Sequence, residues 1–277
     1  MNFANLTTEK RNSASANIDK VSTLEMMKII NGEDKKVAFA VEKVLPEIAA
    51  AVDLIAEKIS DGGRLFYIGA GTSGRLGVLD ASEIPPTFGT SPELVQGIIA
   101  GGEVALISAV EGAEDDFNSA EKILLEKNFC AKDILVGIAS SGRTPFVLGG
   151  INFAKKIGAV TVGLSCVENS ELEKISDIAI TPITGAEIVT GSTRLKAGTA
   201  TKLVLNMLTT GAMIRLGKVY GNLMVDVRAT NEKLRDRAKR IVQAAANCSE
   251  AEAVDALEKN NFHAKSAIDF ILNINRN

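Results

Sequence analysis

Residues 64–75 read Arg64-Leu-Phe-Tyr-Ile68 followed by Gly69-Ala-Gly71-Thr72-Ser73-Gly74-Arg75, an apolar run that ends in a glycine-rich turn. The apolar run predicts a buried strand, and residues 76–82 predict a helix after the turn. Glycines at the spacing GxGxxG expose backbone N–H groups to an anion at the positive end of a helix. That spacing also fits a dinucleotide fold. The hydroxyls of Thr72 and Ser73 argue against a dinucleotide, which needs bare backbone in this loop.

Four further β-branched runs alternate with helical stretches between residue 61 and about residue 225. They are Val95–Ile99, Asp133–Ile138, Val160–Leu164 and Ile178–Ile180. This alternation predicts an α/β fold, a doubly wound parallel sheet with helices on both faces. Ligands of such sheets bind at the carboxyl ends of the strands.

Helical patterns flank the predicted sheet. Ser22 and Glu25 have the spacing of a capping box, which predicts a short helix to about Ile30. Residues 34–59 predict one or two amphipathic helices interrupted at Pro46, and residues 199–217 a long apolar helix suited to burial or to a dimer interface. We therefore expect N-terminal helices over 1–60 that pack on the core, a sheet domain over 61–230 and a small C-terminal helical region over 231–277.

Composition excludes several classes of function. The net charge of the 277 residues is −3 with acidic and basic residues interleaved, which disfavours nucleic-acid binding. No apolar run approaches the roughly 18 residues of a membrane span, and polar residues follow Met1, so we expect a cytoplasmic protein. Three scattered cysteines and the single His263 disfavour a metal site, and we expect no metal and no cofactor. Proton transfer then falls to carboxylates, lysines, hydroxyls or tyrosines.

A second hydroxyl-rich loop follows the strand predicted at residues 133–138. It contains Ser140, Ser141 and Thr144, with Pro145 at a position where a helix can begin. Two hydroxyl loops at neighbouring strand ends suit one phosphate held by neutral donors. The alternative is that these side chains only cap helices.

Two glutamates are candidates for acid and base. Glu83 precedes Pro85 and Pro86, which are expected to end its helix, and the negative helix end favours the protonated form that an acid needs. Glu114 lies ahead of the helical stretch 117–126, where the positive end favours the carboxylate that a base needs. The alternatives are a solvated acid at a helix end for Glu83 and an interchangeable capping acid for Glu114.

Residues 185–202 combine hydroxyls, a carboxylate and three cations directly before the long apolar helix. Polar groups at this density carry a desolvation cost unless they bind something. The binding candidates are Glu187, Ser192, Arg194 and Lys196. A structural network that joins the helix to the sheet is the alternative.

The run Gly185–Lys202 resembles the signature shared by bacterial N-acetylmuramic acid 6-phosphate etherases and the animal glucokinase regulatory protein, which have the sugar isomerase (SIS) phosphosugar-binding fold. The resemblance to the etherases extends over nearly the whole chain, with matching stretches at Leu6–Asn12, Ile18–Thr23, Gly69–Pro86, Ala139–Pro145 and Gly221–Asn231. One departure is Ser13, where the family often has proline. The tail from about Cys248 resembles the small helical domain of etherases.

The resemblance implies removal of D-lactate from N-acetylmuramic acid 6-phosphate with water, giving N-acetylglucosamine 6-phosphate in cell-wall recycling. It implies elimination followed by hydration, with Glu83 as the acid and Glu114 as the base or water-orienting partner. The hydroxyls of both loops would hold the phosphate, and Arg194 or Lys196 would meet the lactyl carboxylate. The fold family also implies a homodimer.

Two other functions remain open at this stage. A non-catalytic phosphosugar sensor that regulates a partner kinase is disfavoured by the chain length, because that relative contains two such sheet domains. A phosphosugar isomerase is disfavoured only by the extent of the etherase match.

Overall fold

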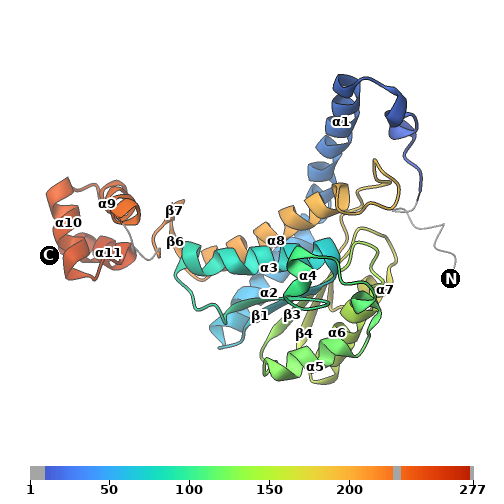
Figure 1. Cartoon of the computed structure of the whole chain (residues 1–277). Coiled ribbons are helices and arrows are strands. Elements are labelled where there is room, and N and C mark those ends of the chain that lie inside the picture. Colours follow the sequence, from blue (N-terminus) through green and yellow to red (C-terminus); the bar gives the residue numbers. More distant parts are fainter. Residues whose placement is uncertain (1–9, 227–231, 275–277) are drawn as a thin grey trace.

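A five-stranded parallel sheet forms the centre of the protein, whose computed structural model describes residues 10–226 and 232–274 (Figure 1). The strands are β1 (Leu65–Gly69), β2 (Val95–Ile99), β3 (Ile134–Ile138), β4 (Val160–Leu164) and β5 (Ile178–Ile180), in the order β2-β1-β3-β4-β5. Every neighbouring pair is parallel. The predicted doubly wound sheet is confirmed, with strand bounds that agree within one residue. The strand order reverses between β1 and β3, the point where such sheets bind ligands.

Helices cover both faces of this sheet. Helices α2, α3 and α8 pack on one face, with α1 against α8, while α5, α6 and α7 pack on the other. The bounds are α1 Thr23–Glu42, α2 Leu45–Ser60, α3 Gly71–Phe88, α4 Val104–Ile107, α5 Ser119–Glu126, α6 Pro145–Lys156, α7 Glu171–Ile175 and α8 Lys196–Arg215.

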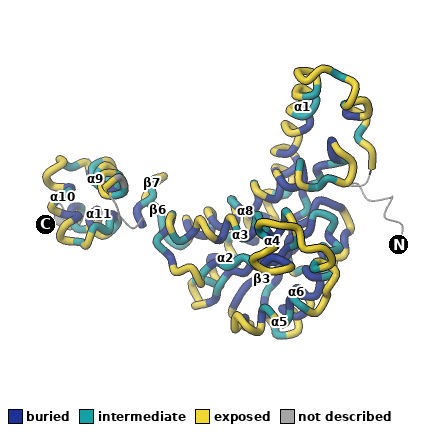
Figure 2. Tube along the Cα trace, in the orientation of Figure 1, coloured by how far each residue is buried: buried dark blue, intermediate teal, exposed yellow. Residues whose placement is uncertain are grey.

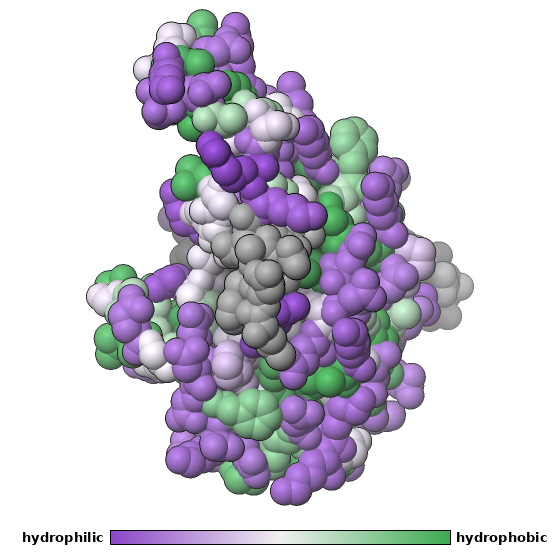
Figure 3. All heavy atoms as spheres, turned by 90° about the vertical axis from the view of Figure 1, so that its right-hand side faces the viewer, coloured by the Kyte–Doolittle hydropathy of each residue, from purple (hydrophilic) through white to green (hydrophobic). Residues whose placement is uncertain are grey.

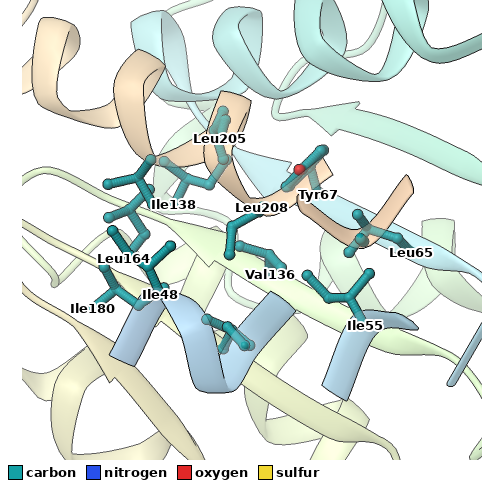
Figure 4. Packing of buried hydrophobic residues seen from close by; sticks show 14 of the residues in the cluster. Ile48, Ile55, Leu65, Tyr67, Val136, Ile138, Leu164, Ile180, Leu205 and Leu208 are labelled. Atoms are coloured by element: carbon teal, nitrogen blue, oxygen red, sulfur yellow. The ribbon is translucent and has the colours of Figure 1, made fainter. Parts of the chain in front are cut away.

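Side chains of β1 alternate between the two faces. Leu65 and Tyr67 join a cluster with residues of α2 and α8 such as Leu208 (Figure 4), whereas Phe66 and Ile68 join a cluster with α5 and α6. All four β1 side chains are fully buried. A strand apolar on both faces is the expected pattern for a parallel sheet covered by helices on each side.

Helix α1 is longer than predicted. Ser22 accepts a hydrogen bond from the Glu25 backbone N–H at 3.3 Å, which confirms the predicted helix start. The predicted end near Ile30 is wrong, because α1 continues through Gly32 to Glu42. One glycine costs a helix about 1 kcal/mol, and burial of Val37 against the core outweighs that cost. The predicted interruption at Pro46 is confirmed, since α2 begins there.

The prediction that Pro85 and Pro86 end their helix is also wrong. Helix α3 continues to Phe88 and ends at Gly89, whose N–H donates to the Pro85 carbonyl at 2.9 Å. Gly89 has a left-handed φ of 65°, the usual conformation after the last helical residue. The buried side chains of Ile84 and Phe88 hold this last turn on the core despite the two missing N–H donors.

A separate hydrophobic core holds the C-terminal helices α9 (Glu232–Ala246), α10 (Glu250–Lys259) and α11 (Ala264–Ile274). A hairpin of β6 (Val219–Tyr220) and β7 (Leu223–Met224) precedes them. The predicted C-terminal helical unit is confirmed, and it stands apart from the sheet in Figure 1. Residues 6–9 and 227–231 of the stretches that resemble etherases lie outside the described residues.

Exposed apolar side chains occur on several elements, and helix α1 carries three of them, Leu24, Met27 and Phe39. This helix projects from the body of the protein and is largely exposed (Figure 2), and the projection at the top of Figure 3 carries hydrophobic residues among hydrophilic ones. Leu24 is 68 % and Phe39 65 % exposed. No helix among residues 10–226 and 232–274 is long and apolar enough to cross a membrane.

A buried carboxyl group lies between α3, α8 and the sheet. Tyr67 Oη donates to Asp80 Oδ2 at 3.0 Å, and Thr209 Oγ1 donates to Asp80 Oδ1 at 3.2 Å. Burial raises the pKa of Asp80 from 3.8 to about 6, although both hydrogen bonds oppose that shift. The folded state therefore binds this proton more tightly than the unfolded chain does.

We expect Asp80 to make stability fall as pH rises from about 4 to about 6, because the folded state must give up a proton that it holds tightly. Asp80→Asn keeps the shape and removes this titration. The free energy of unfolding of the variant minus that of the wild type should increase by up to about 3 kcal/mol across this window and stay constant above it. Urea unfolding at a series of pH values measures this difference. A difference independent of pH would contradict the assignment.

Candidate active site

The two hydroxyl loops meet at the carboxyl ends of β1 and β3. They line a cavity of about 350 Å³, which we call the hydroxyl cavity. The structure brings together six of the predicted site residues in its wall: Thr72, Ser73, Glu114, Ser140, Ser141 and Thr144. The strand order explains the meeting, because β1 and β3 are neighbours although their loops lie about 70 residues apart.

The loop hydroxyls do not serve as helix caps. The residue before α3 is Ala70, which has no side-chain donor or acceptor, and Thr144 precedes α6 without a side-chain capping bond. Within residues 10–226 and 232–274, the five loop hydroxyls make no hydrogen bond to protein. The first N–H groups of α3 also lack partners within the helix, as at any helix N-terminus. Neutral donors gathered at a positive helix end are suited to binding a phosphate.

Glu114 lies in the 3₁₀ turn Ala113–Asp115 and is exposed. It borders the hydroxyl cavity and also a smaller cavity of about 150 Å³. The capping function considered for Glu114 belongs to Asp116, whose Oδ1 accepts the N–H groups of Asn118 at 2.9 Å and Ser119 at 3.2 Å. The Glu114 carboxylate is therefore free to face a ligand at the junction of the two cavities.

Glu83 is not brought to these cavities within one protomer. It is exposed on α3 and lines neither of the two. Ten residues of helix separate it from Ser73, which is roughly 15 Å along the helix axis. Leu79, 45 % exposed, precedes it by one turn on the same helix face.

Glu187 and Lys196 belong to a buried network instead of a cavity wall. The Glu187 carboxylate accepts the backbone N–H groups of Lys196 at 3.0 Å and Ala197 at 2.9 Å, so it caps α8. The Lys196 ammonium, 2 % exposed, donates to Glu33 of α1 at 2.7 Å. This is the structural network considered as the alternative for this stretch.

Glu33 also connects the N-terminal segment to this network, because its carboxylate accepts a hydrogen bond from Asn12 at 2.9 Å. Burial disfavours its charged form, but hydrogen bonds from Lys196, Lys36 and Asn12 outweigh burial and lower the pKa of Glu33 to about 2. Asn12 also donates to the Ala186 carbonyl at 3.0 Å. The network therefore joins α1, the N-terminal segment and the loop before α8.

The remaining predicted residues lie at the edge of the site. Ser192 is half-buried and Arg194 is exposed, and neither lines the hydroxyl cavity, although their neighbours Gly191 and Thr193 do. The prediction missed Asp115 and Arg143 in the wall of the hydroxyl cavity, and Arg75 in that of the smaller cavity. Arg75 lies at the end of the first hydroxyl loop and Arg143 lies within the second. Their position next to the hydroxyls was therefore a signal in the sequence that could have identified both as candidate binding residues.

Two family descriptions match the chain. Residues 47–155 match the glucokinase regulatory protein N-terminal SIS domain, and residues 221–275 match the C-terminal lid domain of glucokinase regulatory protein. The second match begins after β6 and covers β7 and the C-terminal helical unit.

Curated relatives match nearly the full length. The N-acetylmuramic acid 6-phosphate etherase of Clostridium beijerinckii is 62 % identical over 272 residues, which are 98 % of this chain and 90 % of that protein. The etherase of Photobacterium profundum is 60 % identical with the same coverage of both chains.

Solved structures agree on the fold. Phosphoheptose isomerase GmhA from Neisseria gonorrhoeae superposes with a TM-score of 0.53 at 17 % identity, covering 69 % of this chain and 98 % of that one. A phosphoheptose isomerase from Francisella tularensis gives the same TM-score and coverage at 19 % identity. At this identity the likeness concerns the fold alone.

We expect Lys196→Met to lower the free energy of unfolding by about 1.5–3 kcal/mol, because it removes a buried hydrogen bond between charged groups while Lys36 and Asn12 still contact the Glu33 carboxylate. The double variant Glu33→Leu with Lys196→Met should recover much of this loss, since neither charge remains. Arg194→Gln, at an exposed position nearby, should change stability by less than about 0.5 kcal/mol. Urea unfolding of the four proteins measures these values. A stable Lys196→Met protein that binds phosphosugar poorly would instead return Lys196 to the binding site.

Proposed function

The chain belongs to the N-acetylmuramic acid 6-phosphate etherase family, and on that premise we propose that its substrate lies across the two cavities at the β1/β3 edge of the sheet. The protein is an etherase, a carbon–oxygen lyase that cleaves the lactyl ether of N-acetylmuramic acid 6-phosphate. Identity of 62 % over 98 % of the chain carries this conclusion. In our proposal residues 61–230 act as the phosphosugar-binding domain.

The phosphate binds in the hydroxyl cavity. Thr72 and Ser73 approach it from the loop after β1, and Ser140, Ser141 and Thr144 from the loop after β3. Hydrogen bonds to a charged acceptor are stronger than those between neutral groups, so several neutral donors and a helix N-terminus can hold a dianion. Arg143 in the same wall adds one positive charge.

Glu114 then lies beside the sugar carbons that react. As the base, its carboxylate takes the C2 proton of the open-chain sugar, and a C2–C3 double bond forms while the bond from C3 to the lactyl oxygen breaks. The acid gives its proton to that oxygen, and D-lactate leaves. Water then adds its oxygen to C3 and a proton returns to C2, which gives N-acetylglucosamine 6-phosphate. Positioned acid and base groups each contribute roughly 10²–10⁴-fold to such a rate.

We propose that Glu83, the acid, acts on the substrate of a partner protomer in a homodimer. The distance along α3 separates Glu83 from its own cavities, whereas Leu79 on the same helix face exposes apolar surface that a second protomer would cover. Exposed apolar side chains on the projecting α1 support the same assembly. Helix α8 contributes little to this interface, because most of its apolar side chains are buried within the protomer.

We also propose a cytoplasmic location. Cys130, Cys166 and Cys248 are all free thiols, and Cys130 is exposed, as expected in a reducing compartment. Fractionation of producing cells checks this location, and recovery only from an extracellular fraction would contradict it.

The reaction is tested by incubating the protein with N-acetylmuramic acid 6-phosphate in oxygen-18 water. We expect D-lactate without label and N-acetylglucosamine 6-phosphate with label at C3, because hydration follows elimination. Glu83→Gln should bind phosphosugar normally and release lactate about 10²–10⁴-fold more slowly. Ser141→Ala should instead weaken binding by about 0.5–1.5 kcal/mol. Absence of lactate with wild-type protein would leave the sensor or the isomerase as the function.

Subunit mixing tests the shared site. Glu83→Gln and Glu114→Gln dimers, each inactive alone, are dissociated together and reassembled. If each site takes Glu114 from one protomer and Glu83 from the other, random pairing in twofold dimers restores about a quarter of wild-type activity. A mixture that stays inactive, although light scattering shows reassembled dimers, would place Glu83 outside the partner's site.

A further inference from the structure

A second cavity lies directly beside the hydroxyl cavity. It has a volume of about 150 Å³ and shares Ala70, Gly71 and Glu114 with its larger neighbour. We call it the alanine cavity, because five alanines line it, Ala70, Ala100, Ala105, Ala109 and Ala113, together with Val110. A cavity of about 150 Å³ has room for a molecule as large as benzene, so it admits a short substituent of a sugar.

The wall of the alanine cavity also contains a cation. Arg75 of α3 lines the alanine cavity, and its Nε donates to the Leu106 carbonyl at 3.1 Å. That bond holds the side chain against α4 and leaves the two terminal NH₂ groups without an acceptor among residues 10–226 and 232–274. A guanidinium held in this way can donate two parallel hydrogen bonds to a carboxylate.

We propose that the alanine cavity is the subsite for the D-lactyl arm of the substrate and that Arg75 binds the lactyl carboxylate. This inference rests on the proposed function. With the phosphate in the hydroxyl cavity and Glu114 at the junction near C2, the substituent on the neighbouring C3 points into the alanine cavity. The lactyl methyl group then meets the alanine methyl groups, and the carboxylate meets the guanidinium.

The other candidate cations do not fit this subsite. Lys196 is buried and paired with Glu33, and Arg194 is exposed and lines neither cavity. Arg143 borders the hydroxyl cavity alone. Arg75 therefore replaces Arg194 and Lys196 as the proposed partner of the lactyl carboxylate.

Two acidic side chains in the wall of the alanine cavity make Arg75 necessary for binding the lactyl carboxylate. Glu111 and Glu114 also line the alanine cavity and would repel an anionic arm. Arg75 supplies the compensating charge for the lactyl carboxylate, which the product N-acetylglucosamine 6-phosphate lacks. The subsite therefore distinguishes the ether substrate from its own product by charge.

Comparison of these two ligands tests the assignment. Arg75→Gln should raise the KM for N-acetylmuramic acid 6-phosphate roughly 10- to 100-fold, as expected for a lost hydrogen bond to a charged group. The inhibition constant of N-acetylglucosamine 6-phosphate should stay within about twofold, because that ligand carries no carboxylate. Arg75→Lys keeps the charge without the paired donors and should give an intermediate KM. The control Arg194→Gln should leave both constants unchanged.

Each other outcome has a definite meaning. An equal loss of affinity for both ligands would assign Arg75 to a group they share, such as the acetamido arm, and would overturn the proposal. An unchanged KM in Arg75→Gln would do the same. If Arg75→Gln fails to fold in a thermal melt, Arg75→Lys decides the matter by the same pair of constants. Wild-type protein that releases no lactate would remove the etherase function itself, which separates that failure from failure of the subsite.

Discussion

The parallel pairing of β1 with β3 determines where the ligand-binding crevice of this protein lies. Connections from these two strands lead to opposite faces of the sheet, so their loops diverge and leave a crevice between them. Thr72 and Ser73 reach the crevice from one side, and Ser140 and Ser141 from the other. A substitution in the hydrophobic core that shifted either strand would separate the donors without touching any of them.

The charges of the chain fall into two groups with different tasks. Lys196 and Glu33 neutralise each other inside the protein and anchor the start of α8 to α1. Arg75 and Arg143 stay at the cavity walls, where their charge is available to an anion. A cation cannot serve both tasks, because one that compensates a buried carboxylate is already neutralised and shielded from solvent.

The sequence was sufficient for the sheet and for the hydroxyl cavity, because both depend on local patterns. Apolar runs of three to five residues mark the strands, and each hydroxyl loop directly follows one of them. It was insufficient for Pro85 and Pro86, since tertiary packing of Ile84 and Phe88 overrides the local tendency to end a helix. It also could not distinguish buried from exposed cations. Lys196 and Arg194 lie two residues apart in a polar stretch, and only the approach of α1, 163 residues away from Lys196, buries the lysine.

The end of α3 limits how freely the C-terminal unit can be exchanged in evolution or by design. A Cβ atom at Gly89 would lie 2.2 Å from the carbonyl oxygen of Asp226, at the end of the hairpin segment. Asp226 in turn pairs with Lys218 and lies 3.2 Å from His263 of the helical unit. The sheet domain and the segment before the helical unit therefore meet in a close contact between Gly89 and the Asp226 carbonyl group. A helical unit grafted from another protein would need the same close approach of its backbone to Gly89. The sheet domain therefore accepts only C-terminal units that make this contact.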